Sequence, residues 1–183
     1  IEVQTGGAFN TQSNALEFEG DLRSTGTLNM PGIIRMLNSD KQQIDIQGTL
    51  VLDTLIVDNT SGVEIVSGNL DINGKLEINA GSFYTNDALR LLSNSAWTAY
   101  IAEIKGNLIG KIKAQRNIPQ TFAKIGYRHL SSPLKNTVLK DFMYDPINYP
   151  KGIYFYGIGG SNMSYYHWPN AYSFNENFAG LGT

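Results

Sequence analysis

The chain has no cysteine and few charged residues, which make up 16% of its 183 positions. The lack of cysteine excludes disulfide bonds and thiolate-ligated metals. No apolar run approaches the roughly 18 residues of a membrane helix, so we expect no transmembrane segment. Polarity comes instead from 19 glycines and from many Asn, Ser and Thr residues, a composition typical of an extracellular all-β protein.

A seven-residue phrase recurs four times in the first part of the chain. It reads apolar, acidic, apolar, polar, Gly, any residue, Leu, and it occupies residues 16–22, 44–50, 70–76 and, more loosely, 102–108. Its glycines are Gly20, Gly48, Gly74 and Gly106, so the intervals between phrases are similar and the last is the longest. A repeat of this length built from alternating strands predicts a β-solenoid, in which each coil stacks on the last.

The phrase also predicts how the coils stack. Alternation, as in Leu70-Asp71-Ile72, sends one set of side chains inward and the other to water. Aligning residue 44 with residue 70 places Leu50 on Leu76, so the predicted stacking unit equals the interval between phrases. We therefore expect equivalent corners for the phrase glycines, a bulged loop around 93–97, and one core shared by the leucines at 22, 50, 76 and 108. An antiparallel sandwich with glycine turns is the competing fold, but it gives no reason for an aligned unit.

The pattern changes near residue 107. The repeat spacing ends, and twelve of the 20 aromatic residues lie between 142 and 178. Strands are expected at 126–130, 153–156 and 164–168. The predicted fold is thus all-β in two domains. Residues 1–106 form right-handed parallel β-solenoid coils, and residues 107–183 form an antiparallel, jelly-roll-like β-sandwich that is incomplete at its C-terminal end.

Five short motifs follow one another in residues 44–183, after the first coils. They are Gly-Lys-Ile-Lys-Ala-Gln-Arg-Asn-Ile-Pro at 110–119, Tyr-Arg-His-Leu-Ser-Ser-Pro at 127–133, Tyr-Phe-Tyr at 154–156, Trp168, and Gly-Leu-Gly at 180–182. In order and spacing they resemble the β-solenoid plus β-sandwich module of large secreted surface proteins of the Bacteroidota. The resemblance implies export by the type IX secretion system and an extracellular location, either displayed on the outer-membrane surface or released from it, and it supplies no catalytic residue.

Catalytic motifs are scarce. His129 and His167 do not make a zinc site, which needs three or four ligands, and Ser131-Ser132 lacks the G-x-S-x-G context of a nucleophile. Asp45 and Asp71, on neighbouring rungs of the expected solenoid, would lie close enough for a carboxylate pair. A ladder of repeat-consensus acids is more simply an outward strand position. We therefore expect no enzyme activity, no metal and no cofactor.

Two features suggest binding instead. Exposed rings of Tyr165, Tyr166 and Trp168 would suit stacking on glycans, although large rings also fill sandwich cores. Residues 107–183 carry eight bases and three acids, which would attract anionic partners or simply be solvated.

The function that these patterns favour is an extracellular structural or adhesive surface protein, a non-catalytic stalk or display module of a larger secreted protein. The alternative is a carbohydrate-binding or polysaccharide-degrading β-helix module. The expected partners are other segments of the same large protein or cell-surface proteins, with glycans as a further candidate. No nucleic-acid motif appears.

Overall fold

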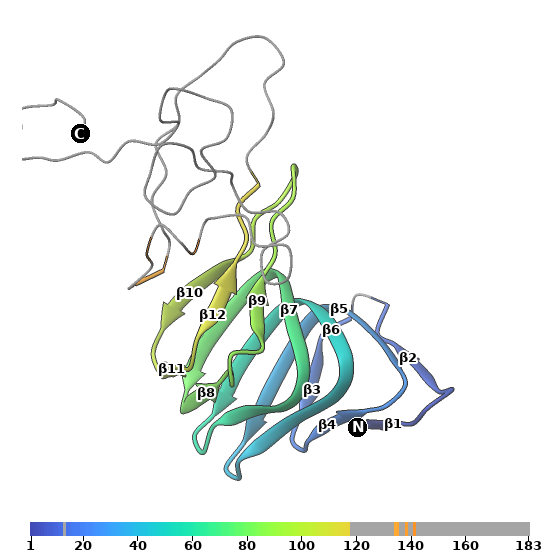
Figure 1. Ribbon diagram of the computed structural model, residues 1–183. Helices are drawn as coiled ribbons and strands as arrows, with labels where there is room; N and C mark the ends of the chain where they lie inside the picture. Colours follow the sequence, from blue (N-terminus) through green and yellow to red (C-terminus); the bar gives the residue numbers. More distant parts are fainter. Residues whose placement is uncertain (13, 118–133, 136–137, 139–140, 142–183) are drawn as a thin grey trace, which may run out of the picture. The chain divides into compact units, whose positions relative to one another are not determined.

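The computed structural model describes residues 1–12, 14–117, 134–135, 138 and 141. The chain forms two compact units, Ile1–Tyr127 and Arg128–Thr183, and nearly all of the described residues belong to the first. That first unit contains a parallel β-solenoid of about five turns. Figure 1 shows its coils following one another from the N-terminus at β1 to β12. The predicted all-β solenoid is therefore confirmed.

Strands account for the described elements of this unit, and every pairing between named strands is parallel. The long strands β6 and β7 bend at glycines with positive φ, Gly48 and Gly68, and so run along more than one face of the coil. The strands are β1 Glu2–Val3, β2 Ala8–Asn10, β3 Leu16–Phe18, β4 Leu22–Ser24, β5 Thr27–Asn38, β6 Gln42–Asn59, β7 Val63–Ala80, β8 Ser82–Tyr84, β9 Leu89–Leu91, β10 Tyr100–Ile104, β11 Asn107–Ile109 and β12 Ile112–Ala114.

The core consists of columns of aliphatic side chains, one residue from each coil. One column joins β5 through β12: Met30, Leu52, Ile72, Leu91 and Ala114. Another joins β3 through β10: Leu16, Ile34, Leu55, Leu76 and Ile101. Leu22, Leu50 and Leu76 are fully buried in this one cluster, and Leu108 packs against it while partly buried. The prediction of a single continuous core is confirmed.

The predicted stacking unit, equal to the interval between phrases, is wrong. Leu50 lies on Leu70, not on Leu76, and Leu52 lies on Ile72. Most coils therefore contain fewer residues than the interval between two phrases. Each phrase is consequently shifted along the coil, by almost its own length, relative to the phrase before it. The end of one phrase consequently stacks on the start of the next, as Leu22 does on Ile44.

The prediction that the phrase glycines occupy equivalent corners fails for the same reason. A Cβ on Gly68 would meet the carbonyl oxygen of Gly48, so these two glycines share a corner. Gly106 lies instead against Gly81, and Gly74 lies against the carbonyl of Asp53. The stacking register thus follows corners that are about one coil apart in the sequence. Some of the glycines at these corners belong to the phrases, and others do not.

Asn59 holds one of these corners together. Its fully buried side-chain amide donates to the Asp40 carbonyl at 2.7 Å and to the Gln42 side chain at 2.9 Å. Its side-chain oxygen accepts from the backbone N–H groups of Ser61 at 2.8 Å and Gly62 at 2.9 Å. Buried polar groups need such partners, and the described residues leave no buried side-chain nitrogen or oxygen without one.

A loop takes up the extra length of the last coil, as predicted. Ser93 and Thr98 form an isolated antiparallel bridge, and the backbone N–H of Asn94 donates to the Trp97 carbonyl at 2.8 Å. The parallel pairing then continues beyond residue 106, since β11 pairs with β8 and β12 with β9. Most of residues 107–183, where the β-sandwich is expected, lie outside the described residues, so the two-domain division stays a prediction.

Candidate functional site

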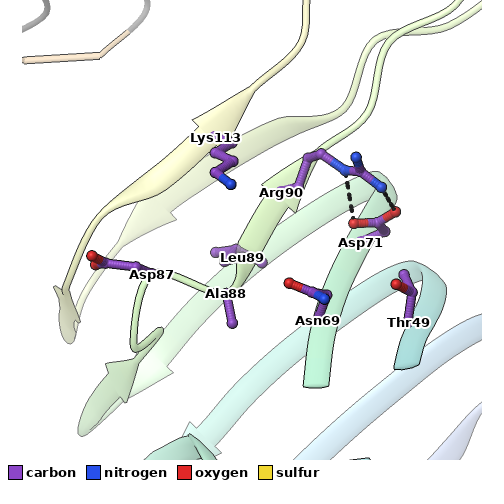
Figure 2. Close-up of a pocket in the computed structure, with 8 residues that line it drawn as sticks. All are labelled: Thr49, Asn69, Asp71, Asp87, Ala88, Leu89, Arg90 and Lys113. Atoms are coloured by element: carbon purple, nitrogen blue, oxygen red, sulfur yellow. Dashed lines mark hydrogen bonds and ion pairs between the residues drawn. The ribbon is translucent and has the colours of Figure 1, made fainter. Parts of the chain in front are cut away.

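An open polar hollow of about 160 Å³ lies on the outer face of the solenoid, across strands β6, β7, β9 and β12. Figure 2 shows its lining from successive coils: Thr49, Asn69, Asp71, Asp87, Arg90 and Lys113, with Ala88 and Leu89 at its floor. Each polar side chain comes from an outward position or a corner, because the alternating positions Leu70 and Ile72 point into the core.

The stacking register places the charged residues of the hollow in one column. Asp71 lies beside Val51 of the preceding coil and Arg90 of the following coil. Arg90 in turn lies beside Lys113. Neighbouring strands are about 4.7–4.9 Å apart, so these three charges occupy consecutive rungs on the same face.

Asp71 and Arg90 form a two-pronged ion pair. The Arg90 Nε donates to Asp71 Oδ1 at 2.9 Å, and its Nη2 donates to Oδ2 at 2.5 Å. The carboxylate is covered by this contact, since Asp71 is only 3% exposed, whereas the Arg90 side chain remains 42% exposed. These hydrogen bonds favour the protonated guanidinium and raise the pKa of Arg90 above its ordinary value.

The other polar groups of the hollow are open to solvent. Thr49, Asn69 and Lys113 are exposed, and their side chains make no hydrogen bond or ion pair within the described part of the chain. Asp87 accepts the backbone N–H of Lys111 at 2.8 Å. Figure 2 shows the Asp87 carboxylate turned away from Arg90, the Lys113 ammonium between β12 and β9, and the Arg90 guanidinium directed toward Asp71. The charged groups best placed to meet a ligand are therefore the donors Arg90 and Lys113.

This arrangement favours reversible binding over catalysis. Both oxygens of Asp71 are engaged by Arg90, so that carboxylate is a poor general base or nucleophile. No group of three or more potential metal ligands occurs among the residues that the structure describes. Hydrogen bonding and charge attraction are the interactions that the hollow offers.

The expected ladder of repeat-consensus acids is not formed. Asp45 lies between Arg23 and Ser67, and Ser67 donates to its carboxylate at 2.5 Å. Asp71 lies between Val51 and Arg90, so Asp45 and Asp71 are not neighbours. The ladder depended on a coil as long as the phrase interval, and the shorter coil pairs each of these acids with cationic or neutral side chains instead.

Several predicted sites fall beyond the described residues. These are the candidate stacking residues Tyr165, Tyr166 and Trp168, the histidines 129 and 167, and three of the eight basic residues between 105 and 140, namely Lys124, Arg128 and Lys140. Lys111, Lys113 and Arg116 are described and exposed. The described segments contain no helix with the length and hydrophobicity that crossing a membrane requires.

Sequence reasoning missed the Asp71–Arg90 pair and therefore the hollow around it. The usable signal was a pair of opposite charges 19 residues apart, which is one coil of this solenoid but not one repeat of the phrase. Arg90 lies outside all four phrases, so phrase alignment could not find it.

No known protein family, curated protein or solved structure matches this chain. The fold is therefore established from the chain's own stacking pattern.

Proposed function

We propose that this chain is a structural module of the cell surface, a non-catalytic stalk or display segment of a larger secreted protein. The observation that carries the proposal is the continuous aliphatic core, in which inward positions of successive coils stack in register. The side chains of the interior therefore hold the coils together, because each coil buries its apolar face only against its neighbours.

The surface of the described coils supports the same proposal. The hollow described above is small, and its buried carboxylate is neutralised by Arg90. A polysaccharide lyase or hydrolase of the β-helix type would need an accessible pair of acid and base groups. Asp45 and Asp71 were the best candidates in the sequence, and they belong to separate columns.

The resemblance to Bacteroidota surface modules motivates three finer parts of the proposal. They are export by the type IX secretion system, display at the outer-membrane surface, and an antiparallel β-sandwich in residues 107–183. Its partners would be other segments of the same protein or neighbouring surface proteins.

The test of location uses intact cells of the organism that carries the chain. We expect antibody labelling and proteinase K cleavage of the chain on unlysed cells, with both lost when type IX secretion is disabled. Signal only after lysis would contradict surface display.

The test of catalysis uses the purified full chain against neutral and acidic polysaccharides. We expect no reducing sugar and no unsaturated product. Product release that disappears in Asp45→Asn or Asp71→Asn would overturn the structural proposal in favour of the enzyme alternative.

A further inference from the structure

We propose that the hollow around Arg90 and Lys113 binds the anionic group of an acidic polysaccharide, a sulfate ester or a uronate carboxylate. This proposal goes beyond the structural role and does not depend on it, because a stalk with or without this site would have the same core. Its residues are also different from those of the aromatic segment 165–168.

The charges of the hollow support anion binding. Arg90 is compensated by Asp71, but Lys113 on the next rung has no ion pair within the described residues. In Figure 2 the Lys113 ammonium lies between β12 and β9, and the Arg90 guanidinium extends toward Asp71. An anionic polymer lying across these rungs would therefore pass both Lys113 and the guanidinium N–H groups that Asp71 does not use. Charge-assisted hydrogen bonds of this kind are roughly twice as strong as neutral ones.

The Arg90 side chain is held in place before any ligand binds. The two hydrogen bonds from Arg90 to Asp71 fix the plane of the guanidinium, so little side-chain freedom is lost when a ligand binds. The opposing charge of Asp87 is partly offset, because its carboxylate accepts the Lys111 backbone N–H and is turned out of the hollow. A lysine without an ion pair in the described coils, next to a fixed arginine, makes a defined anion position.

The neutral polar groups of the hollow favour a sugar polymer over other anions. The same lining contains the Thr49 hydroxyl and the Asn69 amide, which can both donate and accept hydrogen bonds to ring hydroxyls. Both side chains are exposed and make no hydrogen bond within the described coils. The hollow is also open and crosses several coils, so a chain could continue past it on either side. An apolar pocket that would hold the side chain of a peptide is absent from this lining.

The experiment measures binding of the full chain to dextran sulfate, polygalacturonate and unsubstituted dextran at low salt. We expect binding to one or both acidic polymers and none to dextran. Which acidic polymer binds distinguishes sulfate from carboxylate recognition. No binding to either acidic polymer, or equal binding to dextran, would overturn the proposal.

Matched variants test the position of the site. Lys113→Gln should weaken binding about tenfold, as expected for the loss of one charge-assisted contact. Lys111→Gln removes the same charge two positions away, on an exposed side chain outside the hollow, and should weaken binding less than about twofold. Asn69→Ala should weaken binding without any change of charge.

Both lysines are exposed, so unchanged melting temperatures are expected and serve as the folding control. Equal weakening by Lys111→Gln and Lys113→Gln would mean diffuse attraction and would refute a defined site. Polyglutamate, an anionic polymer without sugar rings, is the last ligand to be tested. If it binds as tightly as the acidic polysaccharides and with the same dependence on Lys113, the assignment to a polysaccharide is wrong.

Discussion

The Arg90 guanidinium donates two hydrogen bonds, of 2.9 and 2.5 Å, to the Asp71 carboxylate of the adjacent coil, 19 residues earlier in the sequence. Val51 occupies the same column one coil earlier, so this face accepts an aliphatic residue at an equivalent position. The Asp71–Arg90 ion pair therefore occupies positions at which aliphatic side chains could also make the contact between coils.

Replacing only Arg90 should destabilise the fold more than replacing both Arg90 and Asp71. Arg90→Met leaves a covered carboxylate without its donors and should lower the free energy of unfolding by about 1–3 kcal/mol. The double variant Asp71→Val with Arg90→Met should recover much of that loss, because no unpaired charge remains. Urea titrations of the two variants make the comparison, and a double variant less stable than Arg90→Met would contradict it.

The inward face can be tested at two adjacent residues of β7. Leu76 is fully buried in the core, and Leu76→Ala should lower the free energy of unfolding by about 2–5 kcal/mol. Lys75 is half-buried on the outer side and pairs with Glu77 at 2.7 Å, so Lys75→Ala should cost less than about 1 kcal/mol. Equal losses in denaturant titrations would show that the assignment of faces is incorrect.

A glycine corner provides a test of the register. Gly81 has φ of +67°, and a Cβ there would overlap the Asn59 carbonyl oxygen of the preceding coil. Gly81→Ala should cost at least the roughly 1–3 kcal/mol of a strained left-handed residue, with the steric overlap added. Gly20, which has no atom within 4 Å of its Cβ position, provides the control. Thermal melts in which Gly20→Ala is as harmful as Gly81→Ala would argue against the corner assignment.

The stability of the solenoid should also depend on pH through Glu64. Hydrogen bonds from Lys41 and then Asn86 lower the pKa of the Glu64 carboxyl, and Lys41 lies 2.6 Å away. A lowered pKa in the folded state means that the stabilisation is present above the unfolded pKa, about 4.3, and is lost as pH falls through the folded value.

Unfolding midpoints measured from pH 7 downward are the corresponding readout. Relative to Glu64→Gln, the unmodified chain should be more stable near neutrality and should lose that advantage below about pH 4. Lys41→Gln removes the partner and should reduce the same advantage. An advantage that grows toward acidic pH would have the opposite sign from the one that this ion pair requires.

The sequence by itself determined the class of fold and the identity of the inward residues. Strict alternation of Leu and Ile with polar residues requires strands with one buried face, and the recurring phrase requires that many coils share it. The loop at 93–97 also followed from the sequence, because the last interval between phrases is the longest.

Only the tertiary structure decided the register and therefore the site. Leu50 finds an aliphatic partner whether it stacks on Leu76 or on Leu70, so hydrophobicity does not distinguish a coil as long as the phrase interval from a shorter one. The corners distinguish them, because backbone crowding at Gly68 and Gly81 and the buried hydrogen bonds of Asn59 fit only the shorter coil. That choice separates Asp45 from Asp71 and places Arg90 beside Asp71, since a shift in stacking register changes every neighbour on the outer face.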